Sequence, residues 1–572
     1  MKQFCILIVA CLFTLSVAAQ KKPLDHSVYD GWQSIGEKLI SNNGKWIVYS
    51  VTPQEGDADL FIQSASGDYK KQVARGYDAQ ITEDSRFVVF KIKPFYIDTR
   101  EARIRKKKAD ELPKDSIGIL ALGSDTVFKK AMVRSFKLPA KASGWVAYQK
   151  EKEPASRSSN GATQKTVDSL RKTIDSLVLL VTEIKNIKAG NKDEKDADEE
   201  PSSAPAFIEG SDLVLRNLEK GSERTFKRVR DYLFNEEGQK LVLHVTRSAK
   251  DSTTANAVLV VDLAAGRVDT IIKGGNEFKN FAITEDGRTV AFLAERDTAA
   301  KTLQKFYGLY VYESGSDSAR LFIDKNSVGM QLGMTVSEHG TISFSKSGKR
   351  LFFGTAPIPP AKDTSLVDID LVKLDIWHYN DDYLQTQQLS RLATELKRNY
   401  LAVYDLAENK MEHLGSEVFP NIIQTDEGDG AIFIAVTDTG RRVESQWTGT
   451  TKKDVYAVNV SSGKKLLVKK NHDGLVYPSA TGKYILLYDH KVRQYLSWDG
   501  RTIKNITSKI KVPLFNEESD TPDDPNPYGV MGWHEGDSAV YVYDRYDIWK
   551  VDPAGIKNPL RISQGRPSHT SY

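Results

Sequence analysis

Cysteine is almost absent from this sequence of 572 residues. The two cysteines, Cys5 and Cys11, both lie close to the amino terminus. The rest of the chain therefore has no disulfide to stabilise it and no thiol chemistry to offer. Its stability must come from burial, and a chain of this length with 40% apolar residues can enclose a large core.

Long hydrophobic runs are also scarce. The most pronounced run, Phe4–Val17, follows the positive Lys2 and is too short to span a bilayer. Small residues at Ser16–Ala19 suit cleavage by signal peptidase, so residues 1–19 are predicted to be a signal peptide and the mature chain to be exported, to the periplasm or out of the cell. Ile8–Cys11 superficially looks like a lipidation motif, but it would leave only a few apolar residues before it. Lipid anchoring is therefore the less favoured alternative.

Neither sign of charge is in excess, because 80 Lys and Arg face 76 Asp and Glu. The chain lacks the basic surface of a nucleic-acid binder, so nucleic acid is not a predicted partner. One local basic cluster, Arg103–Lys108, stands between two predicted strands. We interpret it as a solvated, helical surface loop and not as a binding patch.

The motifs of several enzyme classes are missing as well. No serine has glycine two positions away on both sides, so the strand-to-helix elbow of an α/β-hydrolase nucleophile is absent. His534-Glu535 is not followed by a second histidine, and the Gly-Lys pairs lack the Ser or Thr of a phosphate loop. Asp426–Gly430 lacks the closing Glu of a calcium loop and is interpreted as an acidic turn. We therefore predict no catalytic residue, no metal site and no cofactor in this chain.

A turn followed by a strand is repeated throughout the sequence. In Ile283–Leu293, Asp286-Gly287 is predicted to form a two-residue hairpin turn, after which Val290 and Phe292 recur at the two-residue period of a strand. Eight further copies of this turn precede apolar strands: Asn43-Gly44, Asp84-Ser85, Ser143-Gly144, Glu237-Gly238, Ser347-Gly348, Glu427-Gly428, Thr481-Gly482 and Glu535-Gly536.

Most of these turns recur at roughly 40 to 60 residues, which is the period of a four-stranded sheet in a β-propeller. A second strand-turn-strand usually follows each copy, so two hairpins make one blade. The predicted fold is an all-β propeller of four-stranded blades with helical insertions, and nine turns allow seven to nine blades, with eight as the central number. A pair of β-sandwiches is the alternative, but it would not need one turn repeated at long period.

Two insertions interrupt the predicted blades. Residues 151–206 are rich in Ser, Lys, Asp and Glu and contain a heptad spacing of apolar residues from Val167 to Ile184, which indicates an amphipathic helix. Its apolar face is expected to pack on the propeller rim, and a homodimer contact or contact with another domain is the alternative. A second helix is predicted within Leu384–Tyr400, before the strand Leu401–Tyr404.

Two runs carry a resemblance to a known family. They are Leu374–Tyr383, with the sequence LDIWHYNDDY, and the final stretch, which comprises Glu517-Glu518, Asp523–Gly529, Gly532-Trp533 and Val540–Trp549. Together with the leader and the repeated turns, they resemble the amino-terminal propeller of bacterial secreted prolyl oligopeptidase-family serine peptidases. The resemblance covers residues 20–572, which makes the mature chain one propeller domain.

The resemblance implies a propeller that gates access of short peptides to a catalytic α/β-hydrolase domain. In this family the hydrolase domain follows the propeller and carries Ser, Asp and His, and the sequence ends at Tyr572, where that domain is expected to begin. The hydrolase domain is thus expected to be missing, the chain to be inactive by itself, and an apolar docking face to remain. A stand-alone periplasmic binding scaffold without enzymatic activity is the alternative, because propellers have many unrelated functions.

Arg545 and Asp547 are the candidate site residues, because they are polar groups in the last blade, nearest in sequence to the expected hydrolase. They are predicted to contact that domain or the substrate; a surface salt bridge between the two is the alternative. The paired glutamates that grip a peptide amino terminus in the dipeptidyl-peptidase branch have no clear counterpart, because Glu236-Glu237 and Glu517-Glu518 lack the aromatic-rich context of that motif.

Overall fold

The structure is a computed structural model that describes residues 26–152, 208–251, 253–297, 304–361, 365 and 374–572. It divides into two compact units. The first contains Met1–Leu138 and Ser143–Val229, and the second contains Pro139–Ala142 and Arg230–Tyr572. The predicted signal peptide and the apolar seam from Val167 to Ile184 lie outside the described residues.

In its described residues the first unit has three antiparallel sheets, preceded by a short 3-10 helix, η1 (His26–Gly31), and interrupted by one helix, α2 (Tyr96–Ile104). The first two sheets are β1 (Gln33–Ile40), β2 (Trp46–Pro53), β3 (Asp59–Ser64) and β4 (Lys70–Ala74), then β5 (Gly76–Ile81), β6 (Phe87–Ile92), β7 (Ser116–Ala121) and β8 (Val127–Ala131). The third contains β9 (Val133–Lys137), β10 (Trp145–Lys150), β11 (Ser211–Asn217) and the first part of β12 (Glu223–Phe234).

The second unit begins with the remainder of β12, which continues into β13 (Lys240–Val245), β14 (Ala257–Asp262) and β15 (Val268–Lys273). Next come β16 (Glu277–Ile283), β17 (Thr289–Glu295), β18 (Gly308–Glu313) and β19 (Arg320–Ile323). The following sheet has β20 (Met334–Val336) and β21 (Ser343–Phe344), both paired with β22 (Arg350–Pro357), then helix α4 (Gln385–Glu395), β23 (Tyr400–Asp405) and β24 (Lys410–His413).

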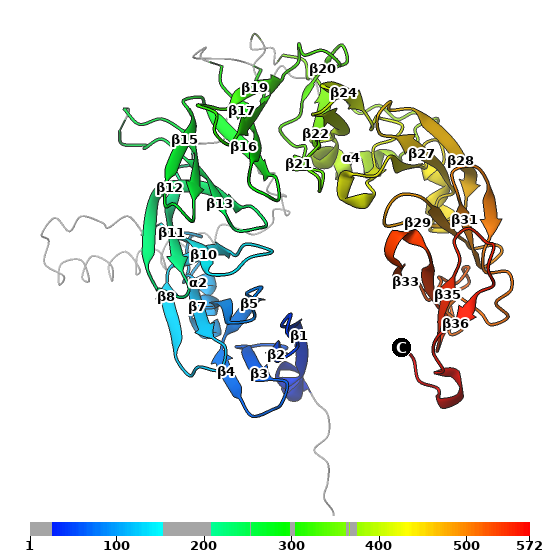
Figure 1. The fold of residues 1–572 in the computed structure, drawn as a ribbon, viewed down its shortest axis with the longest axis horizontal. Coiled ribbons are helices and arrows are strands. Elements are labelled where there is room, and N and C mark those ends of the chain that lie inside the picture. The colour runs from blue at the N-terminus through cyan, green and yellow to red at the C-terminus, as the bar shows by residue number, and fades with distance from the viewer. Residues whose placement is uncertain (1–25, 153–207, 252, 298–303, 362–364, 366–373) are drawn as a thin grey trace, which may run out of the picture. The chain divides into compact units, whose positions relative to one another are not determined.

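Three more sheets complete the second unit. They are β25 (Ile422–Ile423), β26 (Ile432–Thr437), β27 (Lys453–Asn459) and β28 (Lys465–His472); β29 (Gly474–Pro478), β30 (Ile485–Asp489), β31 (Gln494–Trp498) and β32 (Ile503–Asn505); and β33 (Val530–Trp533), β34 (Val540–Tyr543), β35 (Ile548–Val551) and β36 (Leu560–Arg561). Short helical turns are η3 (Asp426–Gly428), η4 (Arg442–Glu444), α5 (Ser445–Thr448), η5 (Glu535–Asp537) and η6 (Arg566–Ser568). Within this unit the sheets follow one another along an arc, with first strands such as β29 and β33 on its inner side (Figure 1).

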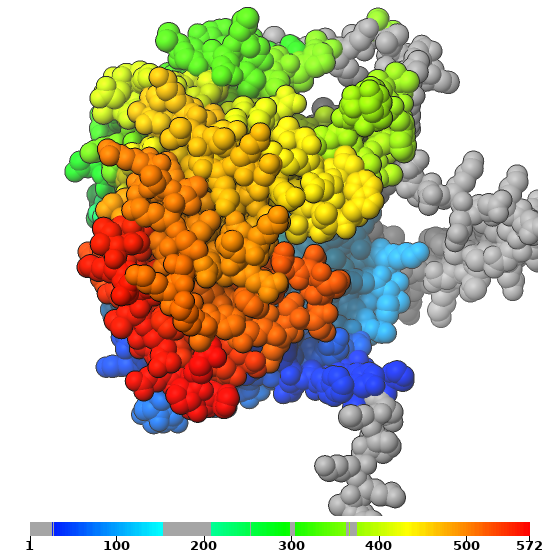
Figure 2. Space-filling view, turned by 90° about the vertical axis from the view of Figure 1, so that its right-hand side faces the viewer, coloured from blue at the N-terminus to red at the C-terminus, as the bar shows by residue number. Residues whose placement is uncertain are grey.

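The fold is a β-propeller, as the repeated turns predicted. The described residues form eight hydrogen-bonded sheets, and the seven-stranded one holds two four-stranded groups that share β12. Counted this way there are nine blades, at the upper end of the predicted range, because one long strand serves as the last strand of one blade and the first of the next. Figure 2 shows the segments after residue 400, coloured yellow to red, meeting in a continuous surface.

The apolar core lies between neighbouring sheets and not inside a pair of sandwiched sheets. In β17, Val290 and Phe292 pack against the sheet β12–β15, while Ala291 and Leu293 on the opposite face pack against the sheet β20–β24. The strand is buried on both faces because a blade covers each of them. This arrangement supports a propeller over the alternative of two β-sandwiches, in which one face of each sheet meets solvent.

The repeated turn is longer than the predicted two-residue hairpin turn. β16 ends at Ile283 and β17 begins at Thr289, and the pair Thr284–Thr289 closes the turn. The Thr284 hydroxyl donates to Asp286 Oδ1 at 2.7 Å, and the Arg288 N–H donates to the same oxygen at 3.0 Å. The Asp286 side chain thus holds the turn, and of the Asp-Gly pair only the glycine, Gly287, has a positive φ, 71°.

The repeated turns of neighbouring blades are joined to one another in the second unit. The contacts are Ser347 N to Asp429 Oδ2 at 2.7 Å, Asp426 N to Ala480 O at 2.9 Å and Thr481 N to Asp537 Oδ2 at 3.1 Å. These turns therefore share one end of the blades, which we call the turn end. Because adjacent strands are antiparallel, the connections between the second and third strands lie at the opposite end, the loop end.

The insertions fall in connections between second and third strands. β10 and β11 pair directly, so the predicted insertion at 151–206 joins two neighbouring strands of one sheet; residues 153–207 are outside the described part. The predicted second helix is confirmed as α4. Helix α2 ends at Ile104, so most of the basic cluster follows it in exposed turns. No helix among the described residues is long and apolar enough to cross a membrane.

Candidate functional site

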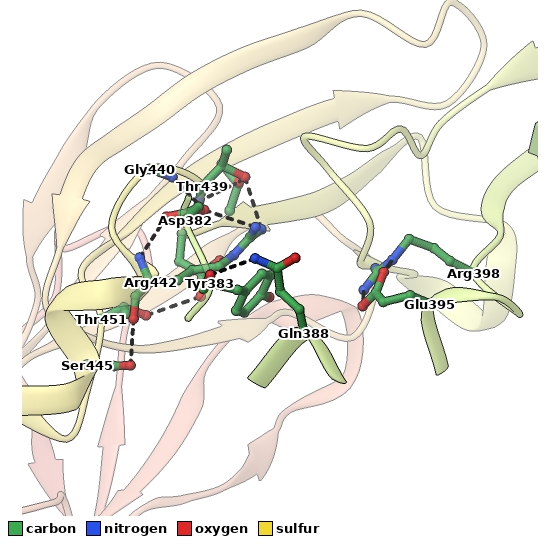
Figure 3. Close-up of polar contacts among 12 residues, drawn as sticks. Asp382, Tyr383, Gln388, Glu395, Arg398, Thr439, Gly440, Arg442, Ser445 and Thr451 are labelled. Carbon is green, nitrogen blue, oxygen red and sulfur yellow. Dashed lines mark hydrogen bonds and ion pairs between the residues drawn. The ribbon is translucent and has the colours of Figure 1, made fainter. Parts of the chain in front are cut away.

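A pocket of about 390 Å³ opens at the loop end of the second unit. It is built from three connections: the segment that leads into α4, the long β26–β27 loop, and the residues around the start of β29 and the end of β30. The first of these is the run Leu374–Tyr383, which carries part of the family resemblance. Figure 3 shows how its last residues meet the β26–β27 loop.

Asp382 fastens the α4 segment to the β26–β27 loop. One carboxylate oxygen accepts the N–H of Gly440 at 2.9 Å, and the other accepts the N–H of Arg442 at 3.0 Å. The Arg442 guanidinium also pairs with Asp382, at 3.0 Å between Nη1 and Oδ2. Gly440 has a φ of 80°, which glycine adopts without strain and which turns its N–H toward the carboxylate.

Arg442 is the centre of this arrangement (Figure 3). Besides Asp382, its Nε binds Asp438 Oδ1 at 2.8 Å, and its Nη2 donates to the hydroxyl of Thr439 at 3.1 Å. Thr451 donates to the second oxygen of Asp438 at 3.2 Å. Burial raises the pKa of Asp438, but the hydrogen bond and charge of Arg442 outweigh burial and hold that pKa below its usual value. Asp438 is thus ionised and already neutralised by Arg442.

Tyr383 lies between two guanidinium groups. Arg442 stands 4.6 Å from the centre of the ring and Arg391, on α4, stands 4.7 Å from it. Cation–π attraction of this kind holds the ring in place and keeps α4 against the loop. Gln388 strengthens the same junction, because its amide donates to the carbonyl of Tyr383 at 2.9 Å.

Several polar groups that line the pocket are not satisfied by the chain. Among the described residues, the carboxamide oxygen of Gln387 and Nε2 of His490 are buried and have no hydrogen-bond partner. The other ring nitrogen of His490 lies 3.4 Å from Asp473 Oδ1. Arg391 and Lys453 also line the pocket, and neither forms an ion pair with a described residue.

Gly474, at the start of β29, is one of the residues that line the pocket. Its φ is 150°, and a Cβ at this position would lie 1.8 Å from the carbonyl oxygen of Tyr488. Only glycine lets β29 approach β30 so closely next to His490 and Asp473.

Large apolar side chains are exposed beside the pocket. Trp377 and Tyr379 precede α4 and are 70% and 91% exposed, and Trp447 on α5 is 78% exposed. We call this set, together with the exposed Leu374, Ile376, Leu384, Leu389, Leu392 and Leu396, the aromatic flank. No residue of α4 is buried. Exposed apolar surface of this kind is typical of an interaction site.

The predicted site residues Arg545 and Asp547 occupy the β34–β35 connection, which is also at the loop end. They do not pair with each other, so the alternative of a mutual salt bridge is not what the structure has. Arg545 pairs with Glu518 and lies over the ring of Tyr546 at 5.2 Å. It remains exposed enough to contact a ligand or partner, and that role stays a prediction.

Asp547 has a structural place instead. Its side chain is fully buried, and Oδ1 accepts the hydroxyl of Ser563 at 2.8 Å and the N–H of Gly565 at 2.7 Å. Burial raises the pKa of Asp547, but these hydrogen bonds and Arg561 outweigh burial and lower it. Asp547 therefore anchors the segment after β36 to the last blade, and a direct contact with a substrate would require that segment to move.

The sequence pointed to one of the three segments that form the pocket and did not point to the other two. Asp382 and Tyr383 belong to the run Leu374–Tyr383, which carries part of the family resemblance, whereas Arg442, His490 and Arg391 are not among the residues predicted for a site. Two adjacent arginines after the turn Asp438–Gly440 are the one local sign of Arg442. Of the paired glutamates Glu236-Glu237 and Glu517-Glu518, Glu236 forms an ion pair with Lys141 at 2.8 Å, and Glu518 forms one with Arg545.

Comparisons with known proteins give no family by sequence. No family model and no curated protein matches the chain. Among solved structures, the chain is similar to a eukaryotic initiation factor, with a TM-score of 0.39 and 9% identity over 83% of this chain and 88% of that one. It is also similar to Pyrococcus horikoshii acylaminoacyl peptidase, with a TM-score of 0.30 and 8% identity over 83% of this chain and 59% of that one.

A third similar structure is the β-propeller domain of the Trilobed protease from Pyrococcus furiosus. Its TM-score is 0.29 and its identity 9%, over 77% of this chain and 99% of that domain. The chain thus spans 59% of the acylaminoacyl peptidase and nearly all of the isolated propeller domain. At these scores the propeller assignment depends on the sheet order and on the cores between sheets described above.

Proposed function

We propose that this chain is the substrate-gating propeller portion of an exported serine peptidase of the prolyl oligopeptidase type, acting on short peptides. One observation supports the proposal most. The two runs that carry the resemblance, Leu374–Tyr383 and Val540–Trp549, lie far apart in the sequence, yet the structure brings the first run and the Asp544–Asp547 connection of the second to the loop end of the second unit.

The aromatic flank gives a place for a catalytic partner to dock. It lies at the same end as the pocket, and a domain that covers it would also cover the pocket mouth and so restrict entry to small substrates. The partner expected from the resemblance is an α/β-hydrolase domain. Residues 566–572 also lie at this end, because Arg566 Nη2 binds the buried Asp544 at 3.0 Å and Ser571 donates to the carbonyl of Arg545 at 3.0 Å.

A specific serine label tests this proposal. The chain alone should neither react with a fluorophosphonate nor cleave alanyl or prolyl peptides, because its sequence contains no Gly-x-Ser-x-Gly elbow to present an activated serine. Reading the coding DNA beyond the codon of Tyr572 should reveal a Gly-x-Ser-x-Gly segment, and that segment supplied in trans should restore labelling and cleavage.

The matched control is a chain with Trp377, Tyr379 and Trp447 replaced by serine. It should keep its fold, because these side chains are exposed, but should no longer support cleavage in trans. Labelling of the chain alone, or a partner segment that works equally well with this triple variant, would contradict the proposal.

A stand-alone binding scaffold is the second candidate. It is favoured by the pocket, all of whose lining residues belong to the second unit of this chain. Ligand binding in the complete absence of a hydrolase partner in the source genome would support it.

A further inference from the structure

We propose that the pocket between α4 and the β26–β27 loop binds the free carboxyl end of an amino acid or short peptide. The inference goes beyond the proposed function and does not depend on it, because the pocket is formed by the second unit alone. It is carried by two cations that line one cavity without an ion pair among the described residues, Arg391 and Lys453, and by two lining residues, Gln387 and His490, whose buried acceptor atoms have no hydrogen-bond partner.

The charges of the pocket separate into used and unused ones. Arg442 is neutralised by Asp382 and Asp438, as described above. Arg391 and Lys453 form no ion pair with a described residue; the carboxylate nearest to Arg391 in its influence, Glu395, is itself paired with Arg398. Two free cations in one cavity attract a ligand anion, and the arginine fork suits a carboxylate.

The buried polar atoms without a partner, on His490 and Gln387, would be satisfied by hydrogen-bond donors. If His490 donates its Nδ1–H to Asp473, as the 3.4 Å separation allows, then Nε2 is an acceptor without a donor. The Gln387 carboxamide oxygen is also an acceptor without a donor. A buried acceptor without a donor is unfavourable, and a ligand N–H or ammonium that reaches it supplies the missing hydrogen bond.

Asp473 completes the pattern. It lines the same pocket, and the His490 ring, 3.4 Å away, is the side chain that its carboxylate contacts among the described residues. The pocket therefore offers two cations, one anion and two hydrogen-bond acceptors. A small zwitterion, with a carboxylate at one end and nitrogen donors next to it, matches this set. The volume of about 390 Å³ is within the range of small-molecule pockets.

Tyr383 fits the same interpretation. Its ring lines the cavity and is in contact with both Arg391 and Arg442, so it offers an apolar surface for a short side chain of the ligand. The ring also fixes the position of Arg391, which reduces the side-chain entropy lost when a carboxylate binds.

The test measures binding of three probes to the whole chain by calorimetry: alanyl-alanine, its carboxyl-terminal amide, and free alanine. Alanyl-alanine should bind saturably, and the amide should bind about 10-fold or more weakly, since a charged hydrogen bond is worth about 1.5–3 kcal/mol. Free alanine separates the two sources of this chemistry: binding as tight as that of alanyl-alanine would assign the pocket to amino acids, and weaker binding would assign it to peptides.

Two variants locate the site. Arg391→Ala should weaken alanyl-alanine binding about 10-fold and leave the weak binding of the amide unchanged. Arg398→Ala, which removes an arginine from the region just after α4 but not from the pocket, should bind like the natural chain. Equal binding of the dipeptide and its amide, no saturable binding of any probe, or equal effects of the two variants would overturn the inference.

The result of this binding test can be told apart from the result of the test of the proposed peptidase function. Binding is read on this chain alone, whereas the peptidase proposal is read from cleavage with a partner segment. Binding without any restored cleavage would leave the zwitterion site standing and defeat the peptidase proposal.

Discussion

Replacing Arg442 with alanine should release α4 and the β26–β27 loop from each other without unfolding the blades. Arg442 joins the two segments through Asp382 and Tyr383, and it lies outside the apolar cores between sheets. Its removal leaves two carboxylates and one ring without their cation. The expected result is a local opening at the loop end and not a global loss of structure.

The size of the effect follows from burial. The Arg442 side chain is 16% exposed, and Asp382 and Asp438 are 23% and 32% exposed. Breaking a fully buried pair costs about 3–5 kcal/mol and breaking an exposed pair at most about 1 kcal/mol, so these half-buried pairs should contribute about 2 kcal/mol. That free energy corresponds to about a 30-fold change in the opening equilibrium.

Hydrogen exchange is the assay, because the structure identifies the backbone N–H groups whose exchange rate should change. The N–H groups of Gly440 and Arg442 both donate to Asp382, so their exchange should accelerate about 30-fold in the variant. Peptides from β26 and β27 should keep their protection. Arg398→Ala is the matched control, because Arg398 pairs with Glu395 three residues away and does not link α4 to the loop. Unchanged exchange at Gly440, or faster exchange throughout β26 and β27, would refute the reasoning.

Two further predictions concern buried titratable groups. Burial lowers the pKa of His244 from 6.5 to about 4, so the free energy of unfolding is highest above pH 6.5 and falls, by at most about 3 kcal/mol, as the pH drops toward 4. In a series of denaturant-unfolding measurements, His244→Phe should lose less of this free energy between pH 6.5 and pH 4 than the natural chain does. Asp547→Ala should free the segment after β36 to proteolysis and cost about 1–3 kcal/mol, while Asp547→Asn, which keeps the acceptor oxygen for Ser563 and Gly565, should cost less; equal losses for the two variants would contradict the anchoring role.

The architecture was predictable because the information that specifies a blade is local. A Thr, an acid and a glycine within five residues, as in Thr284–Arg288, set a turn by their own hydrogen bonds, and an apolar strand follows at once. The number of copies of this turn-and-strand pattern then predicts the number of blades. The prediction of a two-residue turn was wrong. The Asp286 side chain accepts hydrogen bonds from Thr284 and Arg288, and these bonds stabilise a longer loop.

The site was harder to predict because its contacts are distant in sequence. Arg442 and Asp382 are 60 residues apart, and nothing in either neighbourhood signals the other. Periodicity describes one strand at a time and carries no information about which loops meet. Asp547 shows the complementary difficulty: a carboxylate in a polar stretch is expected at the surface, but here it is buried because Ser563 and Gly565 supply the hydrogen bonds that make burial tolerable.

The two ends of the blades differ in a way that locates the chemistry of this chain. At the turn end, side chains close each turn and adjacent turns bind one another, so that among the described residues no repeated turn contains a buried polar atom without a partner. At the loop end, unpaired polar atoms remain on Gln387 and His490, and aromatic side chains such as Trp377 and Trp447 stay exposed. The hydrogen bonds at the turn end therefore contribute to stability. The unpaired polar atoms and exposed aromatic side chains at the loop end are suited to binding. Substitutions at the turn end should therefore change stability alone, while those at the loop end should change binding with little effect on the blades.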